Sequence, residues 1–232
     1  MKHTTFRPRF GHGPLLLVLG GLLASGLAQA ADALPTIQQE WAHCQYQQTG
    51  NAKESCLESL SAKADEASAK EAFRTDLLIW SAIVKSTWAG AKGGLGALGL
   101  VKEAKAKLEI AIKQDPKALE GSAYTSLGSL YYQVPGWPVG FGDDEKAEKL
   151  LKQALAINPT GIDPNFFYGD FLLDQGDKAQ AKVYLDKALA ARWRTRAAEW
   201  KFASVSPSCK HKQHSVLFQL CPPACILVGS VV

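Results

Sequence analysis

The fold of this chain is decided by residues 165–190, which read NFFYGDFLLDQGDKAQAKVYLDKALA. Gly176 and Asp177 form a turn between two segments with helical periodicity. In the first segment, Gly169 marks a position where two helices cross so closely that only a small residue fits. The second segment carries apolar residues at helical spacing on its inward face, at Ala181, Leu185 and Ala188.

The same spacing occurs once before, in residues 124–159. Its first half carries Tyr124, Leu127, Gly128 and Tyr131, and its second half carries Ala147, Leu151, Ala154 and Pro159. The turn of this copy is longer by about seven residues. Two similar copies in succession indicate a stacked repeat architecture, and their pattern resembles the tetratricopeptide repeat (TPR).

The first half of the chain contains two more predicted hairpins. Residues 71–89 form a long apolar helix, residues 90–99 a glycine-rich loop, and residues 100–114 a second helix closed by Asp115 and Pro116. Residues 36–49 and 52–67 form a degenerate repeat or a cap. The sequence therefore predicts an all-α, right-handed TPR-type solenoid of about four helix hairpins over residues 31–191.

Residues 1–30 have the pattern of a signal peptide. Lys2, Arg7 and Arg9 precede a short apolar run, residues 15–27, and Ala28-Gln29-Ala30 offers a cleavage site. The alternative is a membrane anchor that is retained. We expect cleavage before Ala31, a periplasmic location, and a mature chain that does not span the membrane.

Residues 192–232 lack a helical period, and we expect an irregular tail with no defined fold after about Trp200. The abrupt change motivates the hypothesis that this tail is a frameshifted reading, which an intact frame on resequencing would contradict. Its cysteines and histidines have the ligand types of a zinc site, but their spacing matches no usual zinc finger, so we expect no metal; they are Cys209, His211, His214, Cys221 and Cys225.

Charge and composition argue against several functions. The leader contributes three positive charges and the tail a net five, so residues 31–191 carry a net charge of −4 and present no basic stripe for nucleic acid. His43 is the only histidine there, and we expect no enzyme. Gly94 to Gly99 match the letters of a dinucleotide fingerprint but follow a helix rather than a strand, so we expect no cofactor.

Cys44 and Cys56 lie six residues either side of Gly50, the predicted turn of the first hairpin. Positions equidistant from the turn of an antiparallel hairpin face each other, so a disulfide is sterically plausible there. Such a bond is typical of an oxidising compartment. The alternative is two buried thiols.

Residues 90–99, 121–144 and 162–173 resemble a group of secreted bacterial TPR proteins, and the resemblance extends over about residues 41–191. These proteins are distantly similar to the periplasmic TPR proteins that accompany TRAP-type transporters of organic acids and hydrophobic ligands. The resemblance implies a repeat solenoid. It also implies, as a second possibility, a role in transport.

The candidate binding residues belong to the first helices of the last two repeats and to the loop between the two helices of the earlier one. In TPR proteins these first helices line a concave groove, and here they carry Ser129, Tyr131, Tyr132, Gln133, Phe166, Asp170 and Asp174. The alternative is a merely solvated face. Trp137 and Phe141 lie in the Pro/Gly-rich loop, where they either fold back on the core or gate a ligand. We expect this loop and the glycine-rich loop to project from one rim of the solenoid.

We therefore expect a non-enzymatic periplasmic scaffold that holds an extended segment of a partner protein in its groove. The alternative is a TRAP-type transporter accessory that binds a small apolar or organic-acid ligand. A closed pocket lined by Trp137, Tyr131 and Tyr132 would favour the alternative, and an open groove would favour the scaffold.

Overall fold

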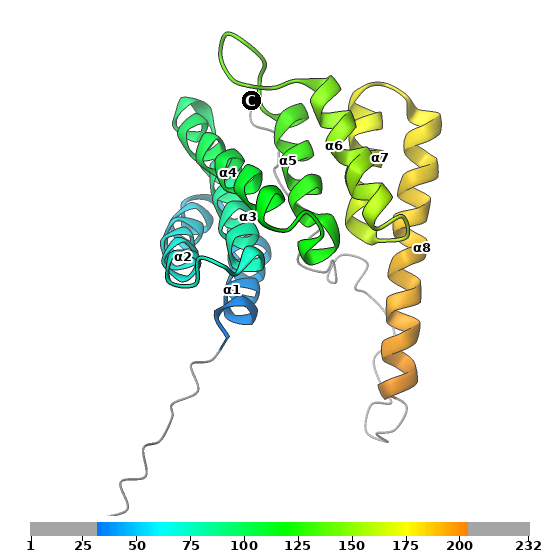
Figure 1. The fold of residues 1–232 in the computed structure, drawn as a ribbon, viewed down its shortest axis with the longest axis horizontal. Coiled ribbons are helices and arrows are strands. Elements are labelled where there is room, and N and C mark those ends of the chain that lie inside the picture. The colour runs from blue at the N-terminus through cyan, green and yellow to red at the C-terminus, as the bar shows by residue number, and fades with distance from the viewer. Residues whose placement is uncertain (1–31, 204–232) are drawn as a thin grey trace, which may run out of the picture. The chain divides into compact units, whose positions relative to one another are not determined.

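The computed structural model describes residues 32–203, with side chains described through Ala191, and this part of the chain folds into four helical hairpins (Figure 1). The helices are α1 (Ala33–Gln47), α2 (Gly50–Lys70), α3 (Thr75–Lys92), α4 (Gly94–Gln114), α5 (Ser122–Gln133), α6 (Asp144–Ile157), α7 (Ile162–Asp174) and α8 (Lys178–Ala203). A 3-10 turn, Ala118–Gly121, precedes α5. The prediction of an all-α TPR-type repeat solenoid is confirmed.

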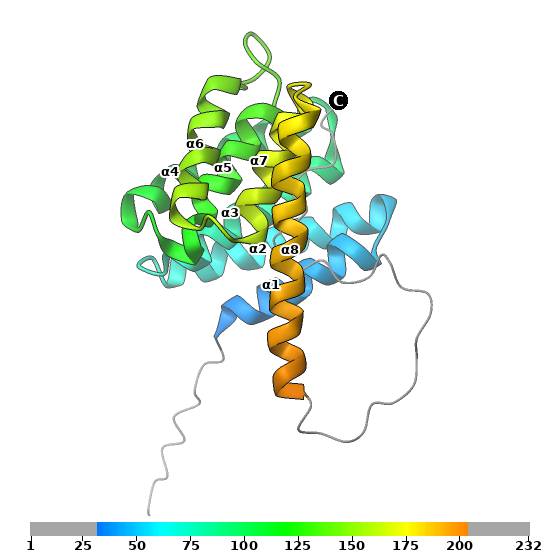
Figure 2. The ribbon, with the colours of Figure 1, turned by 90° about the vertical axis from the view of Figure 1, so that its right-hand side faces the viewer.

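The helices form two layers along the solenoid (Figures 1 and 2). The first helices of successive hairpins touch one another, α1 with α3, α3 with α5, and α5 with α7. Among the described residues the second helices, α2, α4, α6 and α8, make no contacts of comparable extent with each other. The first helices therefore make the inner layer and the second helices the outer one.

Two glycines fix how closely the helices of a hairpin cross. A Cβ atom on Gly128 would lie 2.8 Å from Leu151 Cγ, and one on Gly169 would lie 2.9 Å from Leu185 Cγ. Real Cβ contacts are not this short, so both positions need glycine, as the sequence predicted. The second hairpin has the fully buried Ser81 at the matching position, where its hydroxyl donates to Asp65 Oδ1 at 2.5 Å.

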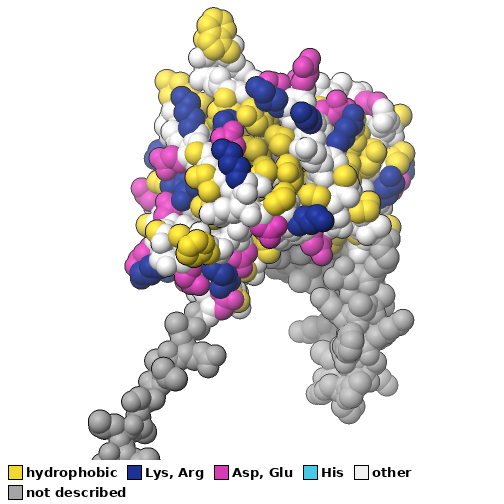
Figure 3. Space-filling model, viewed as in Figure 1, with side chains coloured by type: hydrophobic (Ala, Val, Ile, Leu, Met, Phe, Trp, Pro, Cys, Tyr) yellow, Lys and Arg dark blue, Asp and Glu magenta, His cyan; other side chains and the backbone are white. Residues whose placement is uncertain are grey.

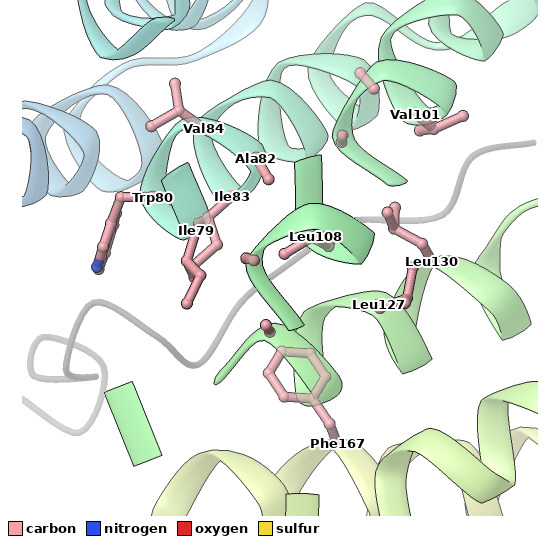
Figure 4. Packing of buried hydrophobic residues seen from close by; sticks show 14 of the residues in the cluster. Ile79, Trp80, Ala82, Ile83, Val84, Val101, Leu108, Leu127, Leu130 and Phe167 are labelled. Atoms are coloured by element: carbon pink, nitrogen blue, oxygen red, sulfur yellow. The ribbon is translucent and has the colours of Figure 1, made fainter. Parts of the chain in front are cut away.

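The apolar core runs continuously from the first hairpin to the last. Figure 4 shows its middle part, where Ile79 and Ile83 of α3 lie near Leu108 of α4, and Leu127 and Leu130 of α5 continue toward Phe167 of α7. Burying one such side chain contributes about 1.5–3 kcal/mol. The four hairpins therefore share one hydrophobic core.

An ionic cluster joins α2, α3 and α4. Lys85 of α3 is 5% exposed, and its ammonium pairs with Asp65 of α2 at 2.8 Å and Glu103 of α4 at 2.7 Å. Lys107 also pairs with Asp65, at 3.1 Å. Burial acts to lower the pKa of Lys85, but the two carboxylates outweigh it and the pKa is raised. The lysine is therefore charged and held between the three helices.

Cys44 of α1 and Cys56 of α2 form a disulfide, with their Cα atoms 5.5 Å apart. The bond lies across the turn of the first hairpin and fixes the start of α2 against the end of α1.

The prediction of a glycine-rich loop over residues 90–99 is wrong. Helix α4 begins at Gly94, and Gly93, with a φ of 64°, makes the turn from α3. Ala97 and Val101 are 0% and 2% exposed, so packing against the core outweighs the low helix propensity of the glycines. Of the two turns that were expected to be expanded, only the one between α5 and α6 is long. The expectation that two long loops project from one rim of the solenoid is therefore also wrong.

Two helix boundaries also differ from expectation. The apolar pattern after Pro116 predicts a helix over residues 117–133, but the fifth helix begins at Ser122, because Leu119 and Glu120 have positive φ values of 47° and 56°. Helix α8 continues to Ala203, past the point after Ala191 where an irregular tail was expected. The signal-peptide prediction for residues 1–30 and the cysteines and histidines from Cys209 onward lie outside the described residues.

Candidate functional site

Helix α7 presents a stripe of three predicted site residues. Phe166, Asp170 and Asp174 are spaced four residues apart and so lie on one side of the helix. The first two are half-buried and Asp174 is exposed. Phe166 is held in place by an edge contact with the buried Phe167, with ring centroids 5.3 Å apart.

The structure brings Tyr132 of α5 to this stripe. Its hydroxyl donates to Asp170 Oδ2 at 2.7 Å, and its ring packs edge-on against Phe171, with centroids 5.6 Å apart. Burial, and then the Asp170 carboxylate, raise the pKa of the Tyr132 hydroxyl well above its usual value of 10.0. The hydroxyl therefore remains a neutral donor that ties α5 to α7.

The Gln133 side chain has a hydrogen-bond acceptor without a partner among the described residues. Its side-chain nitrogen donates to the Tyr132 hydroxyl at 3.1 Å, so its carbonyl oxygen points away from that bond. This oxygen is buried and accepts no hydrogen bond from the described residues. The acceptors that the face between α5 and α7 presents are therefore the carboxylates of Asp170, half-buried, and Asp174, exposed, with the Gln133 oxygen buried behind them.

Ser129 does not belong to this face, which corrects the sequence-based prediction. Its side chain is 0% exposed, and its hydroxyl donates to the Thr125 carbonyl at 3.0 Å. The residue packs inside the repeat, where a hydroxyl satisfied by the preceding turn of its own helix is tolerated.

The loop at residues 134–143 projects from the end of the α5–α6 hairpin (Figure 1). It is tied by backbone hydrogen bonds, from Gly142 N to the Pro135 carbonyl at 3.0 Å and from Asp143 N to the Tyr131 carbonyl at 2.8 Å. At its tip Trp137 is 90% exposed. The indole therefore neither folds back on the core nor lines a pocket.

Phe141 and Tyr131 pack against each other on a different side of α5. Their ring centroids lie 5.5 Å apart, and Lys105 of α4 lies over both rings. Phe141 is thus the part of the loop that folds back on the repeat. Because Tyr131 and Tyr132 face different neighbours and Trp137 is in solvent, these three residues do not enclose a common pocket.

Comparison with known families identifies the repeat. A family model described as a tetratricopeptide repeat matches residues 140–197, from the end of the loop through α6 and α7 into α8. This match supports a tetratricopeptide-repeat architecture for the last two hairpins. No curated protein matches the sequence.

Aligning the last two hairpins at their crossing glycines and leucines reveals a feature that the sequence reasoning missed. Leu127 and Leu150 of the α5–α6 repeat correspond to Tyr168 and Tyr184 of the α7–α8 repeat, because Gly128 and Leu151 match Gly169 and Leu185. A groove lies at these leucines, between α4 and α6. The sequence signal for this groove was the presence of two leucines at the positions where the last repeat has two tyrosines.

In the described part of the chain, none of the helices is long and apolar enough to cross a membrane. The same residues contain no group of three acidic, histidine or cysteine side chains placed to hold a metal ion.

Proposed function

We propose that this TPR protein is a non-enzymatic scaffold of the periplasm. It binds an extended segment of a partner protein across the face between α5 and α7 and the neighbouring loop. The observation that carries the proposal is Trp137, which the loop holds 90% exposed.

An exposed tryptophan is costly in water unless a contact covers it. Tryptophan is also among the residues that contribute most to binding when an interface buries them. The loop is fastened by backbone hydrogen bonds, including Gly140 N to the Gly136 carbonyl at 3.0 Å, so little ordering is needed on binding. The loop thus presents an anchor for a partner.

The face between α5 and α7 supplies matching polar chemistry. The carboxylates of Asp170 and Asp174 can accept hydrogen bonds from a partner, and the half-buried Phe166 gives an apolar contact beside them. An extended peptide offers a regular row of N–H donors and alternating side chains. An acceptor-rich stripe along a helix suits such a ligand.

Two observations support the periplasm. Residues 1–30 have the charge, apolar run and small residues of a signal peptide. The Cys44–Cys56 disulfide is typical of an oxidising compartment. The alternative, a transporter accessory for an organic acid or apolar ligand, has less support because Trp137, Tyr131 and Tyr132 do not enclose a pocket.

Site-specific photocrosslinking in cells tests the proposal. We would place p-benzoylphenylalanine at Trp137 and at Phe166, with a control at Val183, which is 51% exposed on α8. We expect both test positions to trap the same protein and Val183 to trap none of it. Trp137→Ala should remove the product formed at Phe166. Absence of a common product, or an equal yield from Val183, would contradict the scaffold.

A further inference from the structure

An open groove of about 620 Å³ lies on the outer side of α5, between α4 and α6. Its floor includes Leu127 and Tyr131 of α5, and its walls include Ile112 of α4 and Leu150 of α6. Figure 3 shows this region as a hydrophobic surface bordered by dark blue lysine or arginine side chains. It lies apart from the face between α5 and α7.

The last repeat shows how the chain closes such a groove. There Tyr168 is 4% exposed, its ring meets Tyr184 of α8 edge-on at 4.7 Å, and its hydroxyl donates to Glu148 of α6 at 3.4 Å. Tyr168 therefore bridges α6 and α8. Because Leu127 and Leu150 occupy the two matching positions between α4 and α6, the aromatic filling is absent and an apolar hollow remains.

The second hairpin also has a buried aromatic residue at this position. Trp80 stands at the position that matches Leu127, one residue before the crossing Ser81, and it is 4% exposed. Its ring packs edge-on against Trp41 of α1, with centroids 5.8 Å apart. Of the three repeats compared at this position, the α5–α6 repeat has a leucine where the other two have a buried aromatic residue.

Lysines of two kinds border the groove. Lys105, whose ammonium lies over the ring of the groove residue Tyr131, pairs with the groove residue Glu109 at 2.6 Å. Lys146 of the groove pairs with Asp143 at 2.9 Å, so the fold already neutralises both lysines. Lys113 of α4 and Lys149 of α6 line the groove from opposite walls, and neither makes an ion pair within residues 32–191.

We propose that this groove docks a short amphipathic helix of a partner protein, with apolar side chains over Leu127 and Leu150 and carboxylates between Lys113 and Lys149. Apolar area provides affinity, and the facing lysines select an acidic segment. An open trough between two helices suits a helix in a groove better than a small molecule, which is usually enclosed on most sides. The site goes beyond the proposed function and is independent of it.

Fluorescence anisotropy with the full chain tests the groove directly. The probe is a labelled helical peptide with leucines on one face and glutamates on the other. Its controls are a scrambled peptide of the same composition and a version with lysines in place of the glutamates. We expect the acidic amphipathic peptide to bind at least about tenfold more tightly than either control.

Two variants locate the binding. Leu127→Tyr/Leu150→Tyr copies the filling of the last repeat and should weaken binding by at least about tenfold. Lys113→Glu/Lys149→Glu leaves the core untouched and should weaken it by a similar factor. The matched control, Lys178→Glu/Lys182→Glu on the exposed surface of α8, should bind as the wild type does. Circular dichroism would verify that each variant folds.

Three results would overturn the proposal. The first is equal binding of the acidic and scrambled peptides, or no binding of either. The second is unchanged affinity in the lysine variant. The third is a groove that binds phosphatidylglycerol vesicles and not the peptide, with vesicle binding lost in the lysine variant, which would assign it to an anionic membrane surface. None of these results bears on crosslinking at Trp137.

Discussion

At the scale of single residues, Gly128 and Gly169 show how one missing atom determines the distance between two helices. A Cβ added to either glycine would meet the leucine of the facing helix and also a backbone carbonyl, Ala147 O at 3.4 Å for Gly128 or Ala181 O at 3.2 Å for Gly169. Because the two environments are the same, one rule sets the crossing in both repeats.

We predict that Gly128→Ala lowers the free energy of unfolding by about 1–3 kcal/mol, since the added Cβ overpacks against Leu151. The matched control is Gly99→Ala in α4, where a Cβ would meet nothing within 4 Å. That change should stabilise the protein by about 0.5–1 kcal/mol. Urea unfolding measures both, and equal effects of the two changes would contradict this account of the crossing.

Tyr132 gives a pH-dependent prediction. The pKa of its hydroxyl is raised in the folded protein by burial and by Asp170, so the folded state keeps a proton that the unfolded state releases above about pH 10. Its contribution to stability is therefore complete below pH 10 and is lost as the pH rises toward the folded pKa.

Tyr132→Phe should cost about 0.5–1.5 kcal/mol at neutral pH, because the bond to Asp170 is lost. It should also make the decline in stability between pH 9 and pH 11 shallower than in the wild type. Tyr124→Phe is the control, because it removes a tyrosine hydroxyl and leaves Tyr132 and its hydrogen bond to Asp170 unchanged. Its pH profile should match that of the wild type between pH 9 and pH 11. Parallel pH profiles for the wild type and Tyr132→Phe would exclude this role.

At the scale of elements, the two last hairpins differ mainly in their turns. Residues 134–143 join α5 to α6, whereas residues 175–177 join α7 to α8. Both turns end in an aspartate that caps the next helix, Asp143 to Lys146 N and Asp177 to Gln180 N, each at 3.0 Å. The extra residues are therefore not needed to form the hairpin.

We predict that replacing residues 134–142 by the Gln-Gly of the last repeat, with Asp143 kept as the cap, preserves the helical fold. The loss of the contact between Phe141 and Tyr131 should cost about 0.5–1.5 kcal/mol. Crosslinking from Phe166 should disappear with the loop. Circular dichroism and thermal unfolding report the first result, and a variant that unfolds would show that the loop is structural.

The periodicity of the sequence was sufficient to predict those helical hairpins in which the small residues recur at the same spacing. Gly128, Gly169 and the alanines that face them predicted the two last hairpins. The run from Gly94 to Gly99 misled, because local propensity favours a loop while the burial of Ala97 and Val101 in the assembled core favours a helix. Ser129 was misplaced for a related reason: periodicity locates a helix face, but only the packed neighbours decide which side of that face is covered.

The candidate site was predictable in part. The spacing of Phe166, Asp170 and Asp174 placed them on one stripe, and the structure adds Tyr132 and Gln133 through hydrogen bonds. That Tyr131 and Tyr132 diverge follows from the 100° step between adjacent helical residues. The exposure of Trp137 depends on the hydrogen bonds of its loop, which periodicity does not encode.

At the scale of the whole molecule, one shared core and one disulfide hold the solenoid together. The first hairpin has no preceding repeat to pack against among the described helices, so the Cys44–Cys56 bond strengthens the end of the stack. The two cysteines are 12 residues apart. A loop of this length is expected to contribute about 3 kcal/mol by restricting the unfolded chain.

We predict that Cys44→Ser/Cys56→Ser lowers the unfolding free energy by about 2–3 kcal/mol. Adding a thiol reductant should destabilise the wild type by a similar amount and leave the double variant unchanged. Thermal unfolding with and without reductant makes the comparison. A reductant effect of equal size in the double variant would show that it acts elsewhere.

Native mass spectrometry of the protein purified from the cells that express it tests the central claim most directly. We predict a mature chain that begins at Ala31 and carries the mass of a partner protein, and we predict that this mass is absent from the Trp137→Ala variant. A complex with a small molecule in place of a protein, retained equally by the variant, would contradict the scaffold and favour the ligand carrier.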